Sequence, residues 1–198
     1  MSPTTAPSAI EAASTPRVLG PADRLLCAAA DLFAAQGIRA VGIDQILREA
    51  GVAKASLYST YGSKDALVIA YLHELDQGDR NRWNDAVATQ RDPMAKILTF
   101  FELASTAAKA RNFRGCLYAN AATEFPGVEL EPVRAHREWL RTTVATLLRD
   151  AGLPRPETIA RQVQLLYDGA LTGSKIERSV APIILARKLA RSLIGLAS

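Results

Sequence analysis

The stretch Ile43–Lys64, IDQILREAGVAKASLYSTYGSK, decides the fold. Its first half has the i, i+3, i+4, i+7 spacing of an apolar helix face, formed by Ile43, Ile46, Leu47 and Ala50. Gly51 follows and can take the left-handed conformation that ends a helix. A second helix of about two turns fits before Gly62, with Leu57 and Tyr61 facing inward. The pattern predicts two short helices joined by a tight turn.

The outward face of the second helix is small and rich in hydroxyl groups. It consists of Ala55, Ser56, Tyr58, Ser59 and Thr60. A short helix with such a face, held by a fixed turn, can enter a DNA major groove about 12 Å wide. A helical hairpin that only packs is the alternative on spacing alone. Ser63 favours DNA because it can cap the following helix, where Lys64 and free backbone amides form a phosphate-binding corner.

A wider set of residues carries a resemblance to a known family: Leu32-Phe33, Gly37, Ile46-Leu47, Ala50-Gly51-Val52, Lys54, Leu57-Tyr58, Tyr61, Lys64 and Leu67. Through them, residues 24–72 resemble the N-terminal DNA-binding domain of the TetR (tetracycline-repressor-like) family of bacterial transcription regulators. Gly42 departs from that pattern, which usually has threonine or serine there, and so does Thr60, where histidine is frequent. Residues 114–125, RGCLYANAATEF, more weakly resemble a segment found in a subset of these regulators.

The rest of the 198 residues predicts an all-α chain, because long alanine- and leucine-rich runs lack the alternation that strands need. Residues 1–20 are expected to be a disordered arm from which Arg17 could reach DNA. The resemblance implies a helix-turn-helix DNA-binding domain over 21–66, with the motif at about 43–62. Residues 67–198 then form a C-terminal ligand-binding and dimerisation domain.

Composition excludes several classes of protein. Cys27 and Cys116 are far apart and form no CxxC pair, so no disulfide framework or thiolate metal site is expected, and the reducing cytoplasm is the expected compartment. No apolar run approaches the roughly 20 residues of a membrane span, and no secretory signal is expected. GxSxG, HExxH and phosphate-cradling glycine loops are missing, and His73 and His136 stand apart. We expect neither an enzyme nor a bound cofactor.

Charge is a weaker guide to nucleic-acid binding here. The chain carries a formal charge of +4, yet residues 1–80 contain seven lysines and arginines against nine acids, a formal charge of −2. Phosphate contacts must therefore come from a few placed groups, doubled by a dimer, rather than from a general positive field.

Two sets of site residues are predicted. The DNA-binding set is Ile43, Lys54, Ala55, Ser56, Tyr58, Ser59, Thr60, Tyr61 and Lys64. Within it, Lys54, Tyr58 and Lys64 are expected at phosphates, and Ala55, Ser56, Ser59 and Thr60 at base edges. A ligand pocket is expected among helices 93–110, 117–125, 132–150 and 157–178, with walls drawn from Phe101, Cys116, Tyr118, Asn120, Glu124, Trp139 and Tyr167.

The resulting hypothesis is a homodimeric repressor that a small molecule releases from a pseudo-palindromic operator. The last two helices, about 157–178 and 182–196, are the expected dimer interface, because they carry small residues at Gly169, Ala170, Gly173 and Ser174 and apolar residues at Ile183, Ile184, Leu185, Leu189, Leu193 and Ile194. A helix pair buried within one subunit is the alternative. Helix 64–76, with a kink or end near Gly78, is expected to carry the allosteric shift. The alternative functions are a helical protein-interaction adaptor that does not bind DNA and, behind it, a small all-α enzyme.

Overall fold

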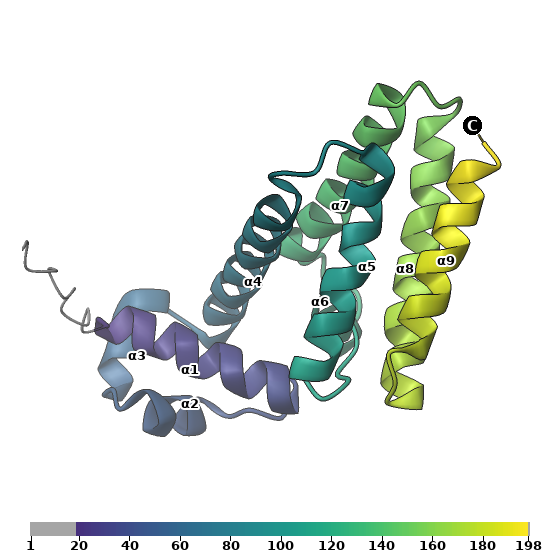
Figure 1. Ribbon diagram of the computed structural model, residues 1–198. Helices are drawn as coiled ribbons and strands as arrows, with labels where there is room; N and C mark the ends of the chain where they lie inside the picture. The colour runs from purple at the N-terminus through teal and green to yellow at the C-terminus, as the bar shows by residue number, and fades with distance from the viewer. Residues whose placement is uncertain (1–18, 198) are drawn as a thin grey trace, which may run out of the picture.

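The computed structural model describes residues 19–197, which form nine α-helices and no strand (Figure 1). The helices are α1 (Pro21–Gln36), α2 (Ile43–Ala50), α3 (Lys54–Tyr61), α4 (Lys64–Val87), α5 (Pro93–Ala110), α6 (Leu117–Glu124), α7 (Glu131–Asp150), α8 (Pro156–Glu177) and α9 (Ala181–Gly195). The predicted all-α class is confirmed. Most of the arm predicted for residues 1–20, including Arg17, lies outside the described residues.

Several helices begin and end at the predicted residues, for the predicted reasons. Gly51 ends α2 in the left-handed conformation, with φ 61° and ψ 42°. The hydroxyl of Ser63 caps α4 by accepting a 3.1 Å hydrogen bond from the backbone amide of Ala66. Asp92 caps α5 in the same way, with Pro93 at the first helical position. Local capping chemistry therefore sets the angle and length of the helices around the motif.

Helix α4 is longer than predicted. It runs from Lys64 to Val87 without ending or breaking at Gly78. A glycine inside a helix costs about 1 kcal/mol relative to alanine. Burial of Trp83 and Val87 beyond it outweighs that cost, because each large apolar side chain contributes about 1.5–3 kcal/mol when removed from water. The longer helix spans both hydrophobic cores of the molecule.

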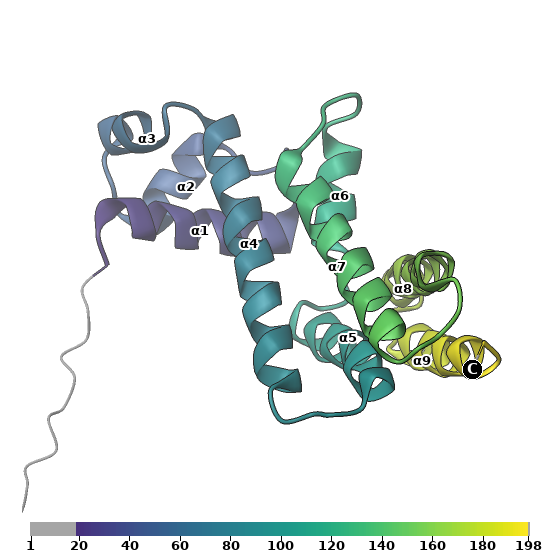
Figure 2. The same ribbon diagram turned by 90° about the horizontal axis from the view of Figure 1, so that it is seen from above.

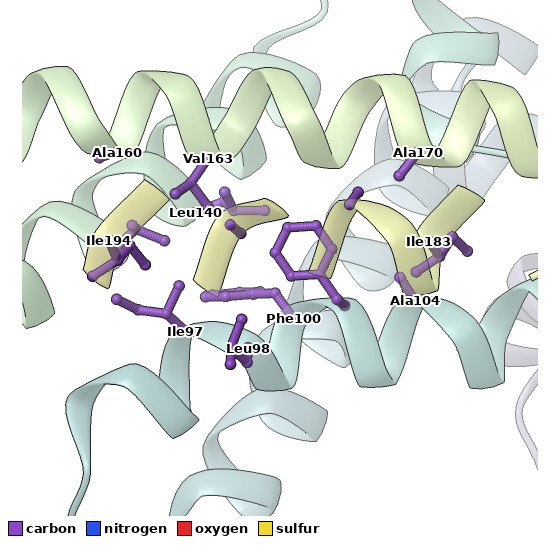
Figure 3. Packing of buried hydrophobic residues seen from close by; sticks show 14 of the residues in the cluster. Ile97, Leu98, Phe100, Ala104, Leu140, Ala160, Val163, Ala170, Ile183 and Ile194 are labelled. Carbon is purple, nitrogen blue, oxygen red and sulfur yellow. The ribbon is translucent and has the colours of Figure 1, made fainter. Parts of the chain in front are cut away.

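The described residues contain two hydrophobic cores. The first joins α1, α2, α3 and the first half of α4, and includes an edge-to-face contact of Phe33 and Tyr71 with ring centroids 5.4 Å apart. Tyr118 and Ala121 of α6 also belong to it. The second core joins the end of α4 to α5, α7, α8 and α9. Figure 3 shows Ile183 and Ile194 of α9 facing Ile97 and Ala104 of α5 across this core.

Helices α8 and α9 lie side by side, on the side of the molecule farthest from α3 (Figures 1 and 2). Their close approach involves Gly173, where an added Cβ would lie 3.0 Å from the Cβ of Pro182. Part of the predicted interface is therefore used inside the subunit, which is the alternative left open above. The residues concerned are Ala170, Gly173, Ser174, Ile183, Leu193 and Ile194.

Candidate functional site

Helix α3 presents an exposed face at one end of the molecule. Lys54, Ala55, Tyr58, Ser59 and Thr60 are exposed, whereas Ser56 is half-buried. Beneath them Leu57 is fully buried and fixes the helix on the first core. The Ser59 hydroxyl donates to the backbone oxygen of Ser56 at 3.2 Å and keeps its acceptor capacity for an external donor. The structure thus brings this part of the predicted DNA-binding set together on one surface.

Three other members of the predicted DNA-binding set have internal contacts. The Tyr61 hydroxyl donates to the backbone oxygen of Ala22 at 3.0 Å, on the inner side of α3. The Lys64 ammonium donates to the backbone oxygen of Ile38 at 2.8 Å, and burial lowers the pKa of this lysine. Ile43, at the start of α2, packs against the first core. These side chains fix the positions of α1, α2 and α3 relative to one another. The Lys64 ammonium therefore has only its remaining donors for a contact outside the protein.

A cavity of about 310 Å³ lies among α4, α5, α6, α7 and α8, and we call it the aromatic cavity. Its wall contains Trp83 stacked on Phe100 with ring centroids 5.1 Å apart, and Trp139 edge-on to both rings. Cys116, Leu117 and Tyr118 at the start of α6 and Tyr167 and Leu171 of α8 close it on other sides. An apolar, aromatic cavity with a few polar groups is typical of small-molecule sites.

The polar side of the aromatic cavity is a chain of hydrogen bonds. Tyr118 donates to Asp79 at 2.8 Å, and the same carboxylate accepts a 2.5 Å hydrogen bond from Arg82. The ring of Tyr118 stacks on His136 at 3.8 Å, and His136 Nδ1 lies 2.9 Å from an oxygen of Asp76. Tyr118 and His136 therefore belong to one network that ties α6 and α7 to α4.

Burial determines the protonation of these rings. It raises the pKa of Tyr118, and the neighbouring Asp79 raises it further. It lowers the pKa of His136, although the hydrogen bond to Asp76 acts in the opposite direction. A neutral imidazole with its proton on Nδ1 donates to the Asp76 carboxylate, which Arg80 also contacts at 2.8 Å. Burial likewise raises the pKa of the Cys116 thiol, which excludes a reactive thiolate at neutral pH.

The predicted ligand-binding residues divide into two groups. Cys116, Tyr118, Trp139 and Tyr167 line the aromatic cavity, within the predicted set of helices, and α4 adds a further wall. Phe101, Asn120 and Glu124 do not line it, which corrects their predicted position. Phe101 is fully buried in the second core. The Asn120 amide donates to the backbone oxygen of Arg114 and accepts a hydrogen bond from the Lys175 ammonium. Glu124 accepts a hydrogen bond from the backbone amide of Arg39.

Other residues of the cavity wall were not predicted from the sequence. Phe100 takes the place expected for Phe101, since consecutive helical residues point about 100° apart. Asp79, Arg82 and Trp83 come from the part of α4 beyond the expected helix end. His136 was set aside as an isolated histidine, and its partner Asp76 lies 60 residues away in the chain.

Residues 19–197 offer neither a metal site nor a membrane-spanning helix. No group of three histidine, cysteine or acidic side chains in this part of the chain is arranged to hold a metal ion. No helix in the same range is long and apolar enough to cross a membrane.

Known proteins share the fold that carries the exposed α3 and the aromatic cavity. Residues 25–71 match the family described as bacterial regulatory proteins, tetR family. The crystal structure of a TetR-family transcriptional regulator from Streptomyces coelicolor has 30% sequence identity and a TM-score of 0.76, over 89% of this chain and 94% of that one. The HTH-type transcriptional regulator LmrA of Bacillus subtilis is 27% identical over 171 residues, which is 82% of this chain and 90% of LmrA.

A third relative extends the comparison to a repressor. The HTH-type transcriptional repressor KstR2 of Mycolicibacterium smegmatis is 26% identical over 124 residues, 60% of each chain. The nine helices of residues 19–197, the helix-turn-helix among them and these relatives all indicate the same family. The chain belongs to the TetR family of bacterial DNA-binding transcriptional regulators, a family of regulators and not of enzymes.

Proposed function

We propose that this protein is a homodimeric repressor whose two α3 helices bind a pseudo-palindromic operator and which a small molecule in the aromatic cavity releases from DNA. The observation that carries the proposal is the exposed face of α3, formed by Lys54, Ala55, Tyr58, Ser59 and Thr60 on a helix anchored by the buried Leu57. Repression is supported by the name of the KstR2 relative.

The residues of α3 divide into two roles. Lys54 and Tyr58, with the free donors of Lys64, contact phosphates and position the helix. Ala55, Ser59 and Thr60, with Ser56 at their edge, face base edges in the major groove. Because this set contains no arginine, asparagine or glutamine, specificity depends on hydroxyl and methyl contacts. At the start of α2, the backbone of Ile43 rather than its packed side chain contacts phosphate.

The dimer forms through the outer faces of α8 and α9. On α8, Leu165 is 70% exposed and Ile176 is 76% exposed, and Gly169 lies between them on the same face. On α9, Leu185 and Leu189 are 58% and 47% exposed. Exposed apolar residues in helical register on two adjacent helices are typical of a subunit interface. A two-fold axis there would set two α3 helices about 34 Å apart, one turn of DNA.

Release by a ligand follows from the path of α4. This helix begins beside α3, and its later residues Asp79, Arg82 and Trp83 line the aromatic cavity. A ligand that prefers one position of α4 shifts the population toward that position, to the extent of its differential affinity. Helix α4 therefore connects cavity occupancy to the spacing of the two α3 helices.

Fluorescence anisotropy with a labelled duplex from the DNA upstream of the gene tests this function. We expect a saturable complex whose affinity falls with salt, and much weaker binding to a scrambled duplex of the same composition. Titration of a cell extract fractionated for small molecules should then release the labelled duplex. If no salt-sensitive complex forms at micromolar protein, the repressor proposal fails and the adaptor alternative replaces it.

A further inference from the structure

A second cavity, of about 600 Å³, lies where α1 meets α4 and the turn between α5 and α6, and we call it the junction cavity. Its charged wall residues are Asp31, Arg111, Arg114 and Arg178. Three guanidinium groups and one carboxylate give this cavity a formal charge of +2. A cavity so lined favours an anion over a neutral or cationic group.

The three arginines are not neutralised by the protein. Within residues 19–197 no carboxylate forms an ion pair with any of them, and the buried Nε of Arg114 has no hydrogen-bond partner. Arg178 donates only to the side-chain oxygen of Asn112, at 2.9 Å. The guanidinium groups of these three arginines therefore keep donors for an acceptor supplied from outside the protein. Guanidinium groups bind carboxylate, sulfonate and phosphate oxygens through paired hydrogen bonds.

The junction cavity adjoins the aromatic cavity. Ala110, Arg111 and Leu117 line both, so the Arg111 side chain stands at their boundary. Burial raises the pKa of Tyr167 in the aromatic cavity, and the charge of Arg111 acts in the opposite direction. This places the guanidinium within electrostatic reach of both cavities. The aromatic cavity offers apolar surface, whereas the junction cavity offers unpaired positive charge.

We infer that the effector is an amphipathic anion, with its flat apolar body in the aromatic cavity and its acidic group bound by Arg111, Arg114 and Arg178 in the junction cavity. The inference rests on the proposed function, since it takes the aromatic cavity to be the effector site. It adds the chemical class of the effector and a second group of residues that bind it.

The position of the acidic group also connects it to the DNA-binding motif. Helix α1 forms one side of the junction cavity through Ala30, Asp31, Ala34 and Ala35. A bound anion there would face the Asp31 carboxylate, and like charges repel. The anion therefore favours an arrangement in which α1 is farther from the α5–α6 turn, which gives the ligand the differential affinity that release requires.

Two matched probes test the inference on the full-length protein without DNA. Anilinonaphthalene sulfonate carries an aromatic body and an acidic group, and phenylnaphthylamine has the same body without the charge. Both tryptophans of the chain, Trp83 and Trp139, line the aromatic cavity, so quenching of tryptophan fluorescence reports its occupancy. We expect Arg111→Gln and Arg114→Gln each to raise the dissociation constant of the sulfonate about tenfold and to leave that of phenylnaphthylamine unchanged.

Two further variants serve as controls. Lys109→Gln removes one positive charge from an exposed position of α5 that lines neither cavity, so both dissociation constants should stay unchanged. Ala107→Phe fills the aromatic cavity and should weaken the binding of both probes alike. Circular dichroism melting curves confirm that each variant is folded.

Three results would overturn the inference. The first is that the sulfonate does not quench tryptophan fluorescence at millimolar concentration. The second is that the arginine variants lose affinity for both probes equally. The third is that inorganic phosphate binds in an arginine-dependent way without competing with the sulfonate. The last result would assign the arginines to a separate free anion. These titrations contain no DNA. If the probes do not bind as expected, the proposal of operator binding is unaffected. If the protein does not bind an operator, the probe titrations can still be interpreted.

Discussion

The carboxylate of Glu124, in the last turn of α6, accepts a 2.6 Å hydrogen bond from the backbone amide of Arg39, in the loop between α1 and α2. Gly37 in the same loop lies so close that an added Cβ would be 3.0 Å from Glu124 Oε1. At the other end of α6, Tyr118 lines the aromatic cavity. One eight-residue helix therefore contacts both the aromatic cavity and the segment that precedes the helix-turn-helix.

Replacement of Glu124 should loosen that segment. In Glu124→Ala the Arg39 amide loses its acceptor, and an exposed hydrogen bond of this kind contributes about 1 kcal/mol. We expect faster hydrogen exchange in the peptide that contains Arg39 and a free energy of unfolding lower by about that amount. Glu129→Ala removes an equally charged but exposed residue and should change neither quantity. Unchanged exchange in Glu124→Ala would show that the contact does not stabilise the loop.

Substitutions on α3 should separate positioning from readout. Tyr58→Ala and Lys54→Ala should each weaken binding to every duplex by about three- to tenfold, and Lys54→Ala should also reduce the salt dependence by about one phosphate contact. Ser59→Ala and Thr60→Ala should instead change which base pairs are preferred, by about 1–3 kcal/mol per affected pair. Anisotropy titrations against duplexes with single base-pair changes measure both effects. Identical profiles for the two pairs would contradict the assigned roles.

Lys64 is a less informative position for such a test. Its ammonium donates to the Ile38 backbone oxygen and lies 5.9 Å from the ring centroid of Phe33. Lys64→Ala should therefore lower the melting temperature as well as the DNA affinity, because it leaves a half-buried carbonyl without its donor. Thermal unfolding of this variant beside Lys54→Ala, whose side chain is exposed, separates the two effects.

Local sequence signals predicted the helix-turn-helix well because the causes are local. The Gly51 turn, the Ser63 cap and the Asp92–Pro93 helix start each depend on backbone groups within four residues. The predicted end of α4 was wrong because its cause is not local. Its length depends on burial of Trp83 against Phe100 of another helix, which outweighs the local preference of Gly78 to break the helix.

The cavity wall could be predicted only in part, because tertiary contacts decide it. Nothing in the sequence distinguishes Phe100, which lines the cavity, from Phe101, which fills the core. The contacts of His136 with Asp76 and Tyr118 join α7 to the neighbouring α6 and to α4, which lies 60 residues away in the chain. The three arginines of the junction cavity likewise come from the α5–α6 turn and the end of α8. Periodicity assigns residues to a helix face but does not assign that face to a neighbour.

His136 should make the stability of the protein depend on pH. Burial lowers the pKa of His136 in the folded state, so the unfolded chain binds its proton at a higher pH than the folded chain. The free energy of unfolding should therefore fall as the pH falls through about 6.5, the ordinary histidine value. His136→Gln should reduce that fall between about pH 7.5 and pH 5.5, as measured by urea unfolding.

The exposed His73 provides the matched control for this measurement. It lies 3.5 Å from Glu131 in a pair that is more than half exposed on both sides. His73→Gln removes one histidine from an exposed position, whereas His136→Gln removes one from a buried position. If both histidine variants behaved alike, the burial of His136 would not be the source of the pH dependence.

The outer faces of α8 and α9 should determine the oligomeric state. Leu185→Glu places a charge among the exposed apolar residues of these helices, where a subunit interface would have to bury it unpaired. A central apolar contact of this kind contributes about 2–4 kcal/mol, so the dimer dissociation constant should rise about 30- to 1,000-fold in analytical ultracentrifugation. Thr146→Glu adds the same charge to an exposed position of α7 and should leave the dimer intact. Operator affinity should fall with the dimer in Leu185→Glu, because each subunit supplies a single α3 helix, and a fully dimeric Leu185→Glu would place the interface elsewhere.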